Sequence, residues 1–328
     1  MRLDHLRQPP VRRILSRALA TGRIAHAYLF AGEPGLGQEE AARAMAAALL
    51  CAEPDEGGAC GRCPSCRKLA GGNHPDVLWM EPEGSSLKTS QVADLIRELR
   101  YRPVEGRVRC VLMAGADTMT MEAANRLLKT LEEPPSEAVL FLLAADEERL
   151  PETIRSRCQR VVFRPLPAAD LARDLEDQGL ASGDRAVWLA RLARGNPGRA
   201  RLLAEHAHLD DLSARVVDDL ARMGQGDLPA ALEAAEQWAA LDPADLALAL
   251  DLGERALVDA WLLAHGFSQD AAWPAADQGM EALAAAWGRT DPERVLTAFA
   301  RPRRRLDARV APWAARDVVF LERQQARR

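Results

Sequence analysis

The most constraining feature of the sequence is a strand, a glycine-containing loop and a helix in direct succession. The apolar run 27–31 has the character of a buried strand, the loop runs from Gly32 to Glu39, and the alanine-rich segment 41–50 is typical of a helix. A loop placed between a buried strand and a helix N-terminus is the setting in which backbone N–H groups cradle phosphate. Strands continue to alternate with helices out to residue 163, and this alternation predicts an α/β domain with a parallel sheet.

The loop keeps the glycines of the phosphate-binding pattern GxxxxGK[ST] and lacks its two reactive residues. Gly32 and Gly37 occupy the glycine positions, Gln38 replaces the lysine, and Glu39 replaces the hydroxyl that reaches magnesium. A carboxylate here repels phosphate, although it suits the positive end of the helix dipole without any ligand. By itself the segment is equally typical of a plain connection between a strand and a helix.

A second loss follows the next central strand, predicted over residues 108–114. P-loop ATPases carry an aspartate for magnesium there, and many add a glutamate that activates water. Ala114 and Gly115 stand at these positions, and Asp117 lies two residues further on. Two independent losses on one retained scaffold predict that this chain neither binds ATP productively nor hydrolyses it alone.

Four of the six cysteines lie within sixteen residues, in the pattern CxxxxxxxxCxxCxxC. Four thiolates at this spacing can surround a tetrahedral zinc ion, and a site with four protein ligands leaves no position open for a substrate. We therefore expect a structural Zn²⁺ held by Cys51, Cys60, Cys63 and Cys66. An iron–sulfur cluster and redox-active thiols are the alternatives.

The length of 328 residues predicts two or three domains. The alternation of strands and helices stops after residue 165, and alanine- and leucine-rich helices fill the remainder. We expect an α/β domain over residues 1–165 with the zinc module 51–66 inserted, a small helical domain over 166–205, and an all-helical domain over 206–328.

The net charge and the hydropathy of the chain limit the nucleic-acid and membrane partners that we expect. The formal charge of −5 argues against a dedicated nucleic-acid binder, but leaves room for local basic patches such as the arginines of segment 97–109 and the run Arg301–Arg309. The first residues lack the apolar core of a signal peptide, and no run is long enough to span a membrane. These features predict a cytoplasmic protein without a membrane partner.

Several motifs occur in a recognisable order. They are His26–Phe30, the loop 32–39, the four cysteines, Gly72–Asp76, Ala116–Thr120, Ala124–Pro134 and Ser156-Arg157-Cys158. Over residues 8–165 the chain resembles the delta-prime subunits of the bacterial DNA polymerase III clamp loader. The resemblance implies an AAA+ module, a helical lid and a C-terminal collar that joins other subunits in a hetero-pentameric ring.

The resemblance also implies a function. Such a chain is an accessory subunit of the DNA polymerase III holoenzyme, and its ring loads a sliding clamp onto primer-template DNA. Arg157, within the motif Ser156-Arg157-Cys158, would be an arginine finger that reaches ATP held by a neighbouring subunit. The alternative for Arg157 is an ion pair with a local carboxylate such as Glu152. Ala145 replaces the residue that senses the γ-phosphate in active members, and the lid arginine is displaced by one position at Arg199.

Two other functions remain open at this stage. An autonomous ATPase would need a phosphate-binding cation near Gln38 and an acidic pair after Met113, and the sequence has neither. A zinc-containing nucleic-acid-binding protein would need a basic surface around residues 51–66. There, acidic side chains offset the basic ones.

Overall fold

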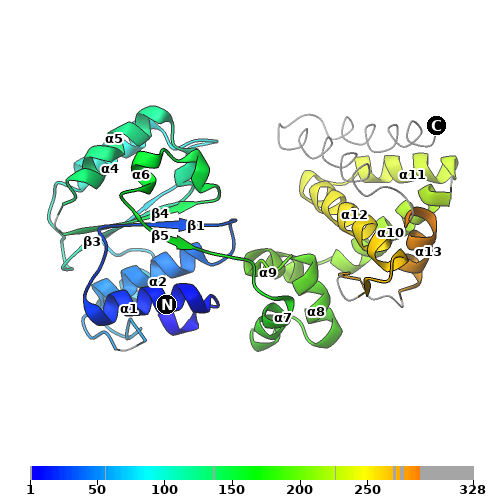
Figure 1. Cartoon of the computed structure of the whole chain (residues 1–328), viewed down its shortest axis with the longest axis horizontal. Coiled ribbons are helices and arrows are strands. Elements are labelled where there is room, and N and C mark those ends of the chain that lie inside the picture. Colours follow the sequence, from blue (N-terminus) through cyan, green and yellow to red (C-terminus); the bar gives the residue numbers. More distant parts are fainter. Residues whose placement is uncertain are drawn as a thin grey trace. The chain divides into compact units, whose positions relative to one another are not determined.

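The computed structural model describes residues 2–55, 57–135, 137–225, 227–268, 271–273 and 277–288. These residues form two compact units (Figure 1). Unit 1 is Met1–Leu166 together with Asn196–Gly198, and unit 2 takes Pro167–Gly195 and the described residues from Arg199 on. The run Arg301–Arg309 lies outside the described residues.

Unit 1 is built on a five-stranded sheet in which every pair of neighbouring strands is parallel. The strand order is β2-β3-β4-β1-β5. The strands are β1 (Ala27–Ala31), β2 (Val77–Met80), β3 (Arg109–Met113), β4 (Ala138–Ala144) and β5 (Gln159–Val162). Because all run the same way, the loops that follow β1, β3 and β4 emerge at one edge of the sheet, where α/β proteins usually bind ligands.

Helices cover both faces of this sheet. On one face lie η1 (Leu3–His5), α1 (Pro9–Thr21), α2 (Gln38–Leu50) and α3 (Pro64–Ala70). On the other lie α4 (Thr89–Glu98), η2 (Ala116–Thr118), α5 (Met121–Glu132), η3 (Glu147–Arg149) and α6 (Glu152–Arg155) (Figure 1). Alternate residues of β1 enter the two cores: Tyr28 and Phe30 pack toward α2, and Leu29 packs toward α5. Burial on both faces explains why β1 and β4 are apolar throughout.

Unit 2 is helical throughout its described residues. Its helices are α7 (Ala168–Asp177), α8 (Gly183–Leu192), α9 (Pro197–Glu205), α10 (Leu209–Gln225), α11 (Leu228–Ala239), α12 (Pro243–Ala264) and α13 (Gln278–Trp287). The first two residues of α9 belong to unit 1. None of the helices in the described part of the chain has the length and apolar run needed to cross a bilayer.

The prediction of a parallel α/β sheet is confirmed, and β1 has the predicted bounds. The helix after the loop begins at Gln38, three residues earlier than the segment 41–50 suggested. Gly37, in the left-handed region with φ 103°, precedes that first turn. The structure divides near residue 166, and the further boundary at 205 stays a prediction.

Candidate functional site

The loop between β1 and α2 is filled from inside by Gln38. The Gln38 Nε2 atom donates hydrogen bonds to the carbonyl oxygens of Gly32, at 2.7 Å, and Glu33, at 2.8 Å. The side chain is 6% exposed, so it lies within the loop rather than in solvent. A lysine at this position would project toward phosphates. The amide instead ties the two ends of the loop together.

Glu39 takes no part in the loop. Its carboxylate pairs with Arg43 one helical turn later, with 2.8 Å between Oε1 and Nε, and half of the side chain is exposed. An exposed pair at this spacing stabilises a helix only slightly. Glu39, which stands where the pattern has the magnesium-binding hydroxyl, therefore forms an ion pair on the surface of α2.

The segment 196–198 closes the loop from outside. Asn196 Nδ2 donates to Pro34 O at 2.8 Å, and the backbone N–H of Gly198 donates to Gly35 O at 2.9 Å. A Cβ atom on Gly198 would lie 2.8 Å from Gly35 Cα, so the close approach requires glycine. The sequence did not reveal this contact, because Asn196 lies 162 positions after Pro34.

Asp117 occupies the region in which a magnesium ligand would be expected. Its carboxylate is buried and accepts hydrogen bonds from the backbone N–H groups of Ala145 and Asp146, each at 3.2 Å. It thereby joins the turn after β3 to the turn after β4. In the loop, the carbonyl oxygens of residues 32–35 have hydrogen-bond donors within the chain, and so do both oxygens of the Asp117 carboxylate.

Arg157 lies in the turn after α6. Its Nη1 atom donates to Thr153 O at 2.9 Å, and its Nη2 atom lies 2.9 Å from Oε1 of Glu132, the last residue of α5. The local-carboxylate alternative had suggested Glu152, whereas the observed partner is Glu132. The side chains of Arg157 and Glu132 are 37% and 48% exposed. An exposed pair contributes about 0–1 kcal/mol, so Arg157 can leave it at low cost.

The neighbours of Arg157 are structural. Ser156 ends α6, and its hydroxyl lies 3.3 Å from Thr153 O. Cys158 packs against the core beside α5, and burial raises the pKa of its thiol to about 12. Ser156 and Cys158 lie on either side of Arg157 in this turn, and the side chain of Arg157 is partly exposed.

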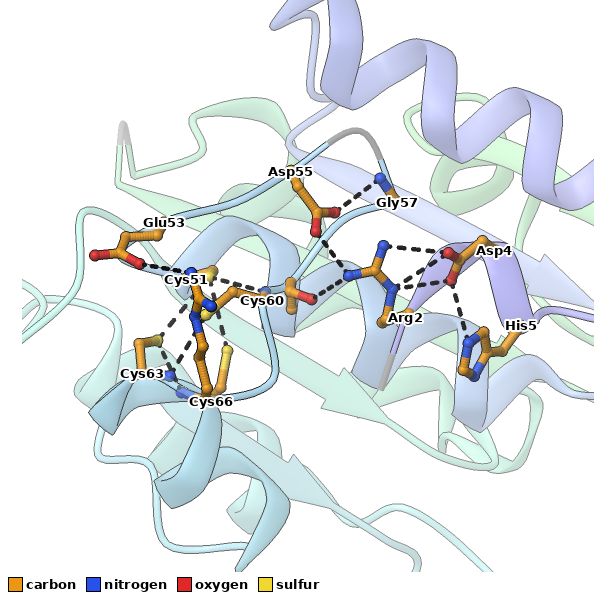
Figure 2. Close-up of polar contacts among 12 residues, drawn as sticks. Arg2, Asp4, His5, Cys51, Glu53, Asp55, Gly57, Cys60, Cys63 and Cys66 are labelled. Atoms are coloured by element: carbon orange, nitrogen blue, oxygen red, sulfur yellow. Dashed lines mark hydrogen bonds and ion pairs between the residues drawn. The ribbon is translucent and has the colours of Figure 1, made fainter.

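The four cysteines converge in unit 1 beyond the C-terminal end of α2, and their sulfur atoms all lie within 4.8 Å of one another (Figure 2). Cys51 Sγ is 3.9 Å from Cys63 Sγ and 3.7 Å from Cys66 Sγ. In a tetrahedral zinc site with bonds of about 2.3 Å, neighbouring sulfurs lie about 3.8 Å apart. The measured separations fit this geometry, so the cluster is able to hold a metal ion.

Backbone donors prepare several of these thiols for a metal. The N–H groups of Cys60, Cys63 and Cys66 donate to the sulfurs of Cys51, Cys60 and Cys63, respectively, at 3.3–3.4 Å. The bond from the Cys66 N–H is the main cause that lowers the pKa of Cys63 to about 6, whereas burial raises the pKa of Cys66 to about 12. Metal binding would displace the remaining protons.

His74 is not a fifth ligand. Its Nδ1 atom accepts from the N–H of Asp76 at 3.1 Å, and its Nε2 atom lies 2.9 Å from Ser65 Oγ. Ser65 donates its own proton to Leu50 O, so Nε2 of His74 carries the proton and donates to Ser65. The buried ring ties α3 and the end of α2 to the start of β2.

A basic groove of about 710 Å³ runs between α4 and α5. Its charged lining residues are Arg97, Arg100, Arg126, Lys129 and Glu122. Not every arginine of segment 97–109 contributes to this surface. Arg109 is buried and donates to Glu98 O and Arg102 O at 2.6 and 3.2 Å.

The known proteins compared below are all subunits of DNA polymerase III. The family model described as DNA polymerase III, delta subunit matches residues 7–167. DNA polymerase III subunit delta′ of Bacillus subtilis is 37% identical over 187 residues, which are 56% of this chain and 54% of that protein. The corresponding delta′ subunit of Pseudomonas aeruginosa is 37% identical over 224 residues, 65% of this chain and 66% of that protein.

A further relative is DNA polymerase III subunit tau of Escherichia coli, 34% identical over 209 residues, which are 62% of this chain and 32% of that protein. The matched region therefore spans from about a third to two thirds of the length of these three relatives.

Proposed function

The chain belongs to the family of DNA polymerase III delta-prime subunits, and on this premise we propose that it is a clamp-loader subunit that does not hydrolyse ATP. In this proposal it joins other loader subunits in a hetero-pentameric ring that places a sliding clamp on primer-template DNA. Residues 1–165 are its AAA+ module, 166–205 its helical lid and 206–328 its collar. Ser156, Arg157 and Cys158 form the motif that acts on a neighbour.

The observation that carries this proposal is the contrast between the sealed loop and the accessible Arg157. Gln38 occupies the loop from inside, and Asn196 and Gly198 bind it from outside. Before it can reach another molecule, Arg157 has to leave the surface carboxylate of Glu132 and the hydrogen bond from its Nη1 atom to Thr153 O. The chain is therefore suited to supply a charge to a neighbour's ATP while its own loop stays empty.

The chemistry of such a finger is electrostatic. A guanidinium stabilises the negative charge that spreads over a transferring phosphoryl group, and a residue supplied in trans makes hydrolysis depend on assembly. Fingers of this type are worth about 10³ to 10⁵ in rate. The four cysteines take no part in this step; we propose that they hold a structural Zn²⁺.

The test is the ATPase of a ring reconstituted from this chain and its delta- and tau-type partners. We expect Arg157→Ala to lower the DNA- and clamp-stimulated rate of the site it faces by about 10³-fold or more, without preventing assembly. Arg160→Ala is a matched control, because Arg160 pairs with Glu147 on the same surface. Unchanged turnover by the Arg157→Ala ring would refute the finger, and turnover by the isolated chain would favour an autonomous ATPase.

The groove between α4 and α5 supports a direct contact with nucleic acid within the same complex. Four basic side chains against one acidic one suit a phosphate backbone. The affinity of the isolated chain for DNA, measured at several salt concentrations, distinguishes between two functions. Tight binding that falls steeply with salt would favour a zinc-containing nucleic-acid-binding protein over a subunit that meets DNA only in the ring.

A further inference from the structure

Residues 2–5, here called the N-terminal strap, lie against the loop 52–59, of which residues 52–55 and 57–59 are described and which separates Cys51 from Cys60. Arg2 makes the polar contacts (Figure 2). Its Nη1 atom donates to Asp55 Oδ2 at 2.8 Å and to Ala59 O at 3.3 Å, and its Nε and Nη2 atoms donate to the carboxylate of Asp4 at 3.2 Å. One guanidinium thus bridges the strap and two points of the loop.

Leu3 supplies the apolar part of the same contact. Its backbone N–H donates to Gly57 O at 3.1 Å, and its side chain is 1% exposed. The side chain belongs to the core cluster that also contains Cys63 and Cys66. The loop itself is folded tightly, because Asp55 and Gly58 exchange backbone hydrogen bonds at 2.9 and 3.0 Å. The strap therefore holds a preformed turn against the core.

The position of this turn bears directly on the metal site. Cys51 follows the last residue of α2, whereas Cys60, Cys63 and Cys66 come from the segment that leads into α3 and from α3 itself. The loop 52–59 joins these two halves, and Ala59 directly precedes Cys60. A metal ion held by both halves can escape only when they separate. Contacts that fix the loop oppose that separation, as groups outside the ligand set commonly do in metal sites.

We propose that Arg2 and Leu3 are positioning residues of the metal centre, which hold the loop 52–59 in place and slow the loss of the metal ion. This inference rests on the metal proposed for the four cysteines. By reciprocity, a bound metal stabilises the docking of the strap, because each favours the same closed arrangement of the loop. Removal of the metal then loosens residues 2–5, although none of them is a ligand.

The experiment measures the rate at which the zinc-loaded full chain transfers zinc to a coloured chelator. We expect Leu3→Ala to release zinc about 10-fold faster than wild type, and Arg2→Ala about 3-fold to 5-fold faster. Gly57→Ala is a variant that keeps every charge. Its Cβ atom would lie 2.0 Å from Arg2 Nη2 and displace the guanidinium, so it should release zinc about as fast as Arg2→Ala.

Two controls separate positioning from a general loss of stability. Arg13→Ala removes an exposed arginine of α1, and Leu15→Ala weakens the same core at a residue that is 0% exposed. Leu15→Ala should lower the Tm, and both variants should release zinc at the wild-type rate. In the reverse arm, chelation should speed hydrogen exchange of the Leu3 N–H and leave that of Leu140, which is bonded within the sheet region to His26 O, unchanged.

The outcomes are distinguishable. Wild-type release rates in folded, zinc-loaded Leu3→Ala and Arg2→Ala would overturn the positioning role and leave the metal assignment intact, as would a Leu3 N–H that exchanges equally with and without metal. A wild-type chain that binds no zinc would overturn the metal assignment and this inference together. Neither result bears on Arg157, so the proposed clamp-loader function stands or falls separately.

Discussion

The regions at the two ends of α2 differ in how complete their sets of ligand-binding residues are. At its N-terminus, the loop 32–39 follows the glycine pattern of a phosphate site without its lysine and hydroxyl, and at its C-terminus Cys51 begins a set of four cysteines that could hold a metal ion. The metal module keeps its sulfurs close together. The loop has its carbonyls bound by Gln38, Asn196 and Gly198. Buried carbonyl oxygens need hydrogen-bond donors, and in this loop other groups of the same chain supply them.

The largest effect is expected in the metal module. Cys63→Ser replaces a buried ligand by a much weaker one, so we expect zinc to fall from about one ion per chain to almost none, with a loss of about 3–5 kcal/mol in the free energy of unfolding. Elemental analysis and urea unfolding measure the two quantities. Cys158→Ser is the control, because Cys158 lies outside the cluster. An equal zinc content in Cys63→Ser and Cys158→Ser would show that the four-cysteine cluster does not hold the zinc.

A smaller effect is expected at Asp76, which precedes β2 and binds the backbone of residues 104–106 ahead of β3. Its carboxylate is fully buried and accepts from the N–H groups of Val104, Glu105 and Gly106 at 2.5, 2.9 and 2.7 Å. Burial by itself would raise the pKa of Asp76, but the three donors outweigh burial and lower it. Asp76→Asn sets an amide against these donors and should cost about 3 kcal/mol at neutral pH.

The sign of the pH dependence follows from the lowered pKa. The stability that Asp76 contributes is complete above the unfolded carboxyl pKa of about 3.9, and it is lost as the pH falls through the lower pKa of the folded state. Urea unfolding of wild type and Asp76→Asn across this range should show the gap between them closing at acid pH. A gap that widens there would contradict the assigned role of the three donors.

The smallest effect is expected in the loop itself. Gln38→Ala removes two hydrogen bonds and should cost about 1 kcal/mol, whereas Glu39→Ala, at an exposed neighbour, should change stability by less than about 0.5 kcal/mol. Gln38→Lys should not restore nucleotide binding, because Asn196 and Gly198 still hold the loop and Ala114 offers no magnesium ligand. Titration with a fluorescent ATP analogue checks this. Tight binding of the ATP analogue by Gln38→Lys would show that Gln38 alone prevents nucleotide binding in this loop.

Much of unit 1 was predictable because its patterns are local. The apolar run of β1 gave its bounds, since burial on both faces of a sheet demands such a run. The spacing of the four cysteines anticipated a cluster that the structure brings within metal-binding distance. The start of α2 was placed three residues late, because a buried glutamine whose amide turns back into the loop does not resemble the first residue of an amphipathic helix.

The partners of the site residues depended on contacts that sequence spacing does not encode. Asn196 reaches Pro34 across 162 positions, and Arg157 pairs with Glu132 rather than with the nearer Glu152. Asp117 was noted as displaced from the magnesium position, but its bonds to the N–H groups of Ala145 and Asp146 depend on the turns after β3 and β4 lying side by side. Such choices are made by strand register and packing.

The sequence by itself determined that Gln38 and Glu39 stand where the phosphate-binding pattern has lysine and a hydroxyl, and that four cysteines occur at a metal-binding spacing, because the identity of each residue is a property of its own position. Only the tertiary structure decided which residues hydrogen-bond to the loop 32–39 and which residues lie around the four cysteines. Gln38, Asn196 and Gly198 close the loop, and Arg2 and Leu3 lie against the turn between the metal ligands. The physical reason is that buried polar groups take whichever partners the fold brings within hydrogen-bond distance.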